Sequence, residues 1–158
     1  MKNYSLIAIL FVVMGFIACS KGGSVAPVVK HIPNPDSLDA MVATLGADSW
    51  AADTISGFLI PIGNDSGKYN LSITGKRVNN NSLISLYISN YTGKGVYYIN
   101  PPTVSATYYY QGSVRHYAIS GQLIISNDST ADMRGTFNFI TDSTGGMNVT
   151  DGTFRLSL

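Results

Sequence analysis

Apolar and polar residues alternate in short segments from residue 40 to the end of the chain, and this alternation most restricts the fold. In residues 68–77, for example, Tyr69, Leu71 and Ile73 occupy every second position. A period of two places these side chains on one face of an extended strand. No segment has the three-to-four residue spacing of an amphipathic helix. The pattern therefore predicts an all-β domain.

Clusters of Gly, Asn, Asp and Ser separate the alternating segments, which is typical of antiparallel strands joined by short turns. The expected strands are residues 41–45, an element starting at Trp50, 54–62, 68–77, 83–89, 96–99, 104–110, 114–126, 131–140 and 147–158. Every acidic residue is Asp, and the chain has 10 Tyr and 16 Gly, which favours strands and turns over helices. The sequence predicts an antiparallel β-sandwich of about 8–10 strands. A closed, lipocalin-like antiparallel barrel is the alternative.

Three local features refine this prediction. Residues 104–110 and 114–126 are expected to pair across 111–113, with Gly121 marking a bulge or bend. Residues 127–129, Asn-Asp-Ser, are expected to form the next turn. The sequence Gly-Thr-Phe occurs at 135–137 and again at 152–154, which indicates two core strands whose glycines allow close approach of a neighbouring backbone.

The N-terminus has the layout of a bacterial secretion signal. Lys2 precedes an apolar run over residues 6–18, and Ala18 precedes Cys19, the one cysteine of the chain. As a helix the run spans about 20 Å, less than the roughly 30 Å hydrocarbon core of a bilayer. We therefore expect a lipoprotein signal peptide over residues 1–18 and lipidation of Cys19 after cleavage. A lipidated Cys19 leaves no thiol for catalysis or for a disulfide.

The rest of the chain divides into a tether and one domain. Residues 19–38 are rich in Ser, Gly and Pro and predict an extended tether, in which His31 is a bystander. Residues 39–158 form the single β domain. The net charge of the chain is +1 and it has no basic stripe, which argues against nucleic acid as a partner.

The signal, the tether, the strand before Trp50, the segment 120–125 and the two Gly-Thr-Phe strands together resemble the small β-rich lipoproteins of Bacteroidetes-type bacteria, whose function is unknown. The resemblance implies an outer-membrane lipoprotein of the cell envelope and transfers no catalytic residue. Residues 20–24 contain no acid, which favours a domain that faces the periplasm, with surface exposure as the alternative.

The residues offer little for catalysis or for metal binding. His116 is the one histidine of the expected domain, and no Gly-x-Ser-x-Gly nucleophile motif occurs. Zinc usually takes three or four N, S or O ligands, so a zinc site is not expected. Oxygen ligands for calcium are conceivable at residues 64–65 and at 127, 128 and 132, but ordinary Asx turns explain them better. We expect no enzyme activity, no metal and no cofactor.

A candidate binding surface lies at the predicted hairpin of residues 104–126. Tyr108 and Tyr110 share one strand face, and Arg115 and His116 are expected across the hairpin from them. Exposed tyrosine rings stack on sugars or anchor a partner protein. The alternative for these residues is ordinary cross-strand packing.

Candidate O-glycosylation sites follow the pattern Asp, then Ser or Thr. The pattern is similar to an acceptor signal of Bacteroidetes-type secreted proteins and occurs at Ser37, Thr54, Ser129 and Ser143. Turn composition alone also produces such matches.

Three functions remain open from the sequence. The first is a non-enzymatic module of the envelope that binds a glycan or an envelope protein, attached to the membrane through the lipid on Cys19. The second is a structural accessory subunit of an envelope complex. The third is a barrel that carries a small apolar ligand.

Overall fold

A computed structural model describes residues 39–63, 67–112, 114–129, 131–142 and 146–158. The described residues form an all-β fold without a helix, as the alternation predicts. The strands are β1 (Ala40–Leu45), β2 (Asp48–Ala51), β3 (Thr54–Pro61), β4 (Tyr69–Arg77), β5 (Ser82–Tyr91), β6 (Gly95–Tyr98), β7 (Val104–Tyr110), β8 (Val114–Ser129), β9 (Asp132–Thr141) and β10 (Asn148–Leu156). The predicted signal peptide, Cys19, the tether and His31 lie outside the described residues. No described segment is a helix of the length and hydrophobicity needed to cross a bilayer.

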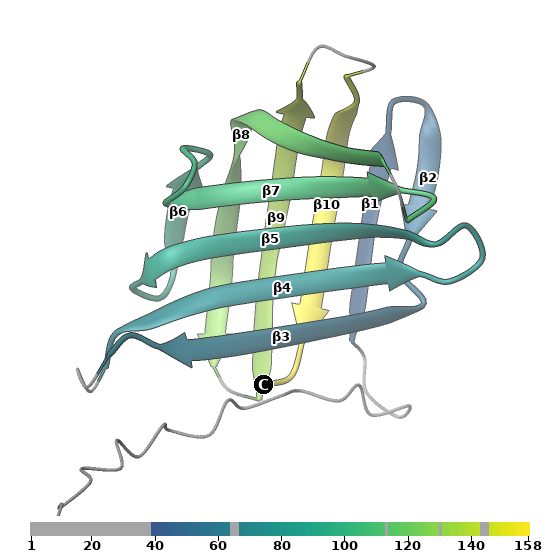
Figure 1. The fold of residues 1–158 in the computed structure, drawn as a ribbon. Helices are drawn as coiled ribbons and strands as arrows, with labels where there is room; N and C mark the ends of the chain where they lie inside the picture. Colours follow the sequence, from purple (N-terminus) through teal and green to yellow (C-terminus); the bar gives the residue numbers. More distant parts are fainter. Residues whose placement is uncertain (1–38, 64–66, 113, 130, 143–145) are drawn as a thin grey trace, which may run out of the picture.

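The strands form one curled antiparallel sheet in the order β2-β1-β10-β9-β8-β7-β5-β4-β3, with β6 paired to β8. Figure 1 shows β3, β4, β5 and β7 crossing in front of β1, β2, β9 and β10. The sheet thus folds over and brings its apolar faces together. The sheet therefore has two parts, one formed by β3, β4, β5 and β7 and the other by β1, β2, β9 and β10, and β8 connects them. One cluster of buried side chains fills the space between the two parts, and it includes Met41, Leu71, Leu86, Leu123, Phe137 and Leu156.

Strand β8 is the element that passes from one part of the sheet to the other. Residues 114–117 pair with β7, whereas the ladder with β9 begins at Ala118. The register shifts between Ala118 and Ser120, and Gly121 has a φ of 137°. A Cβ atom at Gly121 would collide with the carbonyl oxygen of Asn138. The irregularity of β8 thus lies between Ala118 and Ser120, just before the position predicted for a bulge or bend, and Gly121 itself has a backbone conformation in which a side chain would be strained.

Two predicted boundaries are wrong. Residues 127–129 are not a turn but the end of β8, where Asn127 pairs with Arg134 and Ser129 pairs with Asp132. The Asn127 amide donates to the Asp132 carbonyl at 2.6 Å, so cross-strand bonds outweigh the turn preference of these residues. Likewise, the second strand begins at Asp48, and Trp50 is its buried member.

The repeated Gly-Thr-Phe sequence is explained by reciprocal packing between β9 and β10. Gly152 pairs with Phe137, and Phe154 pairs with Gly135. A Cβ atom at Gly152 would lie 2.5 Å from the Phe137 ring, and one at Gly135 would lie 2.5 Å from the Phe154 ring. Both strands are core strands, as predicted, and each phenylalanine ring covers the glycine of the neighbouring strand.

Candidate functional site

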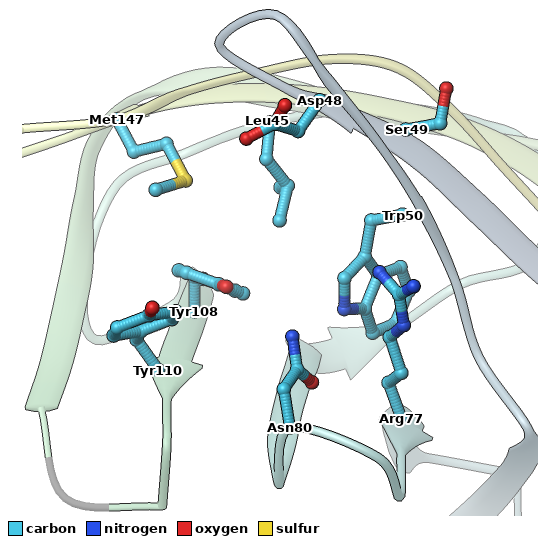
Figure 2. A pocket seen from close by; sticks show the side chains of 9 residues that line it. All are labelled: Leu45, Asp48, Ser49, Trp50, Arg77, Asn80, Tyr108, Tyr110 and Met147. Carbon is cyan, nitrogen blue, oxygen red and sulfur yellow. The ribbon is translucent and has the colours of Figure 1, made fainter.

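A pocket of about 400 Å³ opens at one end of the fold. It lies between the β1–β2 hairpin, the turn that follows β4, and strand β7 (Figure 2). Its lining residues are Leu45, Asp48, Ser49, Trp50, Arg77, Asn80, Tyr108, Tyr110 and Met147. They come from four separate parts of the chain, residues 45–50, 77–80, 108–110 and 147, so only the fold brings them together.

A chain of hydrogen bonds fixes the wall of this pocket. The Trp50 indole is 2% exposed, and its Nε1 donates to Ser82 Oγ at 2.9 Å. Ser82 Oγ in turn donates to Asn80 Oδ1 at 2.6 Å, and the Ser82 backbone N–H donates to the same oxygen at 3.3 Å. These bonds occupy the Asn80 oxygen. The Asn80 amide nitrogen therefore points into the pocket, as Figure 2 shows.

Tyr108 and Tyr110 form the opposite wall, and their ring centroids lie 6.5 Å apart. Tyr108 is 2% exposed, and burial is the main reason that the pKa of its phenol is raised, which keeps the hydroxyl protonated. Tyr110 is 42% exposed and presents its ring at the pocket mouth. Its hydroxyl accepts a hydrogen bond from the Gln111 amide at 3.2 Å.

The structure divides the four residues of the predicted binding surface. Tyr108 and Tyr110 share a face, as predicted, but Tyr108 is buried in the core and not exposed. His116 pairs with Tyr108, its ring stacks on Tyr108 at 6.3 Å, and its Nδ1 lies 3.8 Å from Asp142 Oδ1. Strand alternation places Arg115 on the outer face instead.

On that outer face, Arg115 contacts two tyrosines. Its guanidinium carbon lies 4.6 Å from the centre of the Tyr109 ring and 5.5 Å from that of Tyr117. One guanidinium nitrogen donates to the Tyr117 hydroxyl at 2.7 Å, which raises the pKa of Arg115. Arg115 therefore does not line the pocket with Tyr108 and Tyr110.

Arg77 is a pocket residue that was not predicted from the sequence, and it brings a positive charge to the pocket. Its side chain is half-buried, and no carboxylate among the described residues lies within ion-pairing distance of it. It also lines a second hollow of about 460 Å³. The two hollows share Ser49, Trp50 and Arg77, so Arg77 lies where they meet.

The sequence carries no local signal for Arg77 or Asn80 as site residues. Both stand in a strand end and turn of ordinary composition, Lys-Arg-Val-Asn-Asn-Asn. Trp50, the one tryptophan of the chain, could have been singled out, because a lone tryptophan in a small domain often lines its main pocket or core.

Two of the four candidate O-glycosylation sites lie among the described residues. Thr54 is the exposed first residue of β3, and Ser129 is the exposed last residue of β8 rather than a loop residue. Ser37, Ser143, Asn64 and Asp65 lie outside the described residues.

Metal ligands do not gather in the part of the chain that the structure describes. No group of three or more His, Cys, Asp or Glu side chains lies there in a position to hold an ion. Asp132, one of the calcium alternatives, instead binds Arg134 and Arg155.

Comparison of this chain with family models, with curated proteins and with solved structures finds no match.

Proposed function

We propose that this protein is a membrane-anchored lipoprotein of the cell envelope whose β domain is a non-enzymatic binding module for a glycan. In this proposal the lipid on Cys19 attaches the chain to the outer membrane, and residues 19–38 hold the domain away from it. The ligand site is the pocket between β2, β4 and β7. The observation that carries the proposal is the pairing of an exposed Tyr110 ring with fixed polar groups across one open pocket.

The aromatic and polar groups that line the pocket suit the chemistry of a sugar. A sugar ring has an apolar face that packs on an aromatic ring, and hydroxyl groups around its edge that need hydrogen-bond partners. Tyr110 supplies the ring, Asn80 supplies an amide donor, and Asp48 supplies a carboxylate acceptor. A volume of about 400 Å³ falls in the range of ordinary ligand pockets.

We also favour an open, sandwich-like architecture over a closed barrel. The hydrogen-bonded order of described strands runs from β2 to β3 without a ladder joining those two strands. The interior positions hold large side chains such as Phe137 and Phe139, whose rings lie 6.2 Å apart. Both observations support a binding site at the mouth more than an apolar ligand in the interior.

The test of the binding site is a titration of the protein with neutral and acidic disaccharides, followed by Trp50 fluorescence. Trp50 is the one tryptophan of the chain and lines the pocket, so its emission reports on this site. Replacing Tyr110 by Ala should weaken binding by about two- to tenfold, since an aromatic stacking contact contributes roughly 0.5–1.5 kcal/mol. The matched control, Tyr98→Ala on β6, removes an exposed tyrosine that does not line the pocket and should leave affinity unchanged. Absence of binding by every disaccharide would favour a structural accessory role.

The anchoring part of the proposal is tested in the native host. Cys19→Ser should move the protein from the membrane fraction to the soluble fraction, because no lipid can then be attached. Protease treatment of intact cells should spare the domain if it faces the periplasm, and removal of the domain would place it on the cell surface.

A further inference from the structure

We propose that the group recognised in this pocket is a carboxylate, and that the ligand is an acidic saccharide of the uronic-acid type bound through Arg77. The inference rests on the proposed glycan-binding function and names its ligand class. It begins from the juxtaposition of an unpaired, half-buried guanidinium with a fixed amide donor in the same pocket.

The charge of Arg77 is not compensated within the described part of the protein. Arg134 and Arg155 both bind the Asp132 carboxylate, the former at 2.8 Å and the latter at 2.9 Å. Arg77 has no such partner there, although its side chain is partly buried. Partial burial of a cation without a counter-charge is unfavourable, so an anion bound beside it is stabilised.

Asn80 adds a second donor in a set orientation. Its oxygen accepts from the Ser82 hydroxyl and backbone N–H, so its NH₂ group is left for the pocket. Figure 2 shows this nitrogen directed into the space between Tyr108 and Trp50. A guanidinium fork and an amide N–H are donors that the two oxygens of a carboxylate accept well.

The other charges of the pocket favour a monoanion. Asp48 also lines the pocket, and among the described lining residues Arg77 is the one cation. A phosphate carries a charge of about −1.5 to −2 at neutral pH, so one guanidinium would leave it partly uncompensated beside Asp48. A carboxylate carries a single negative charge, so it leaves less uncompensated charge beside Arg77 and Asp48 than a phosphate does.

The two hollows on either side of Arg77 fit a chain of sugars better than a single small acid. Each has a volume of several hundred Å³, about 400 Å³ and about 460 Å³. A disaccharide with its carboxylate at Arg77 would place one ring beside Tyr110 and the other beside the hollow that reaches Asp151.

The experiment compares acidic disaccharides with their own methyl esters. The full-length lipidated protein in detergent micelles is titrated with disaccharides of galacturonate, glucuronate and mannuronate, and binding is followed by Trp50 fluorescence. The ester keeps the ring and its hydroxyls but removes the charge. We expect at least one acid to bind ten times or more tighter than its ester, and this preference to fall as salt is raised.

Variants assign the preference to Arg77. Arg77→Gln should reduce the ratio of acid to ester affinity to near one, and Arg77→Lys should keep part of it, because an ammonium retains the charge but not the planar fork. Arg134→Gln is the matched control, since it removes an exposed arginine that pairs with Asp132 outside the pocket, and it should leave the ratio unchanged. Thermal melting verifies that each variant is folded.

The outcomes separate this inference from the proposed function. Equal affinity for acids and esters would overturn the carboxylate assignment while leaving a glycan-binding site. Tighter binding of glucose 6-phosphate than of every uronate would also overturn it, in favour of a phosphate ligand. Failure of neutral and acidic disaccharides alike would overturn both proposals.

Discussion

Gly135 and Gly152 show how single positions set the packing of two phenylalanine rings in this core. Each lies opposite a phenylalanine of the neighbouring strand, and the space that a Cβ atom would need is filled by that ring. The sequence repeat indicated two core strands. It did not show that each glycine serves the other strand's phenylalanine, because this depends on the register of β9 against β10.

Replacing Gly152 by Ala should lower the free energy of unfolding by about 1–3 kcal/mol, because the added methyl group collides with the Phe137 ring and overpacks the core. Urea denaturation measures the change. Thr153→Ala, at the exposed neighbouring position of β10, is the control and should change stability by no more than about 0.5 kcal/mol. Equal losses in the two variants would contradict the packing argument.

Ser82 is the residue on which the pocket wall depends. Ser82→Ala leaves the buried Trp50 Nε1 without its acceptor and releases Asn80, so we expect a loss of about 1–3 kcal/mol in unfolding free energy. Trp50 emission should also change. Ser85→Ala on the same strand, whose hydroxyl lies 3.3 Å from that of Thr74, is the comparison. An unchanged stability of Ser82→Ala would mean that water replaces the lost hydroxyl.

At the scale of elements, alternation and turn residues predict most strands to within a few positions. The exception is residues 127–129, where the Asn127 amide donates across to β9 and Asp132 of β9 is in turn bound by Arg155 of β10. Asp132 accepts from Arg134 on its own strand and from Arg155 on β10. No local preference of Asn, Asp or Ser encodes such a contact, which explains why a turn was expected there.

This connection makes stability depend on pH in the acid range. The hydrogen bonds from Arg134, and then the one from Arg155, lower the pKa of Asp132 to about 2. The unfolded carboxyl has a pKa of about 3.9, so the stabilisation is present above about pH 4 and is lost as pH falls towards 2. Asp132→Asn should flatten this part of the profile of melting temperature against pH. Asp48→Asn on β2, outside the cluster, should retain the slope, and an unchanged slope in Asp132→Asn would refute the assignment.

For the whole molecule, the two parts of the curled sheet share one core. Leu156 on β10 is fully buried, and a Cβ atom at Gly57 on β3 would collide with its side chain, so β3 packs directly on β10. In the order of the described sheet, β3 is the last strand at one end, and β10 lies near the other end, beyond which come only β1 and β2. Unfolding of either part therefore exposes the apolar face of the other.

Leu156→Ala should cost about 2–5 kcal/mol by leaving a cavity between the two parts, while unfolding remains a single transition. Far-ultraviolet circular dichroism follows the strands, and Trp50 fluorescence follows the pocket end during denaturation. The midpoints of the two signals should coincide. Ile119→Ala, at an exposed position of β8, should shift neither midpoint appreciably. Separate transitions in Leu156→Ala would show that the two parts fold independently.

The sequence alone determined the all-β class, most strand positions and the shared face of Tyr108 and Tyr110, because a period of two and turn chemistry are local properties. It also led to the expectation of a lipidated Cys19 and a tether, which the described residues do not test. Only the tertiary structure decided which face of β7 is buried and that Arg77, Asn80 and Trp50 meet beside it. The buried face of β7 and the position of these three residues follow from how the sheet folds over on itself. That folding depends on contacts between residues far apart in the chain.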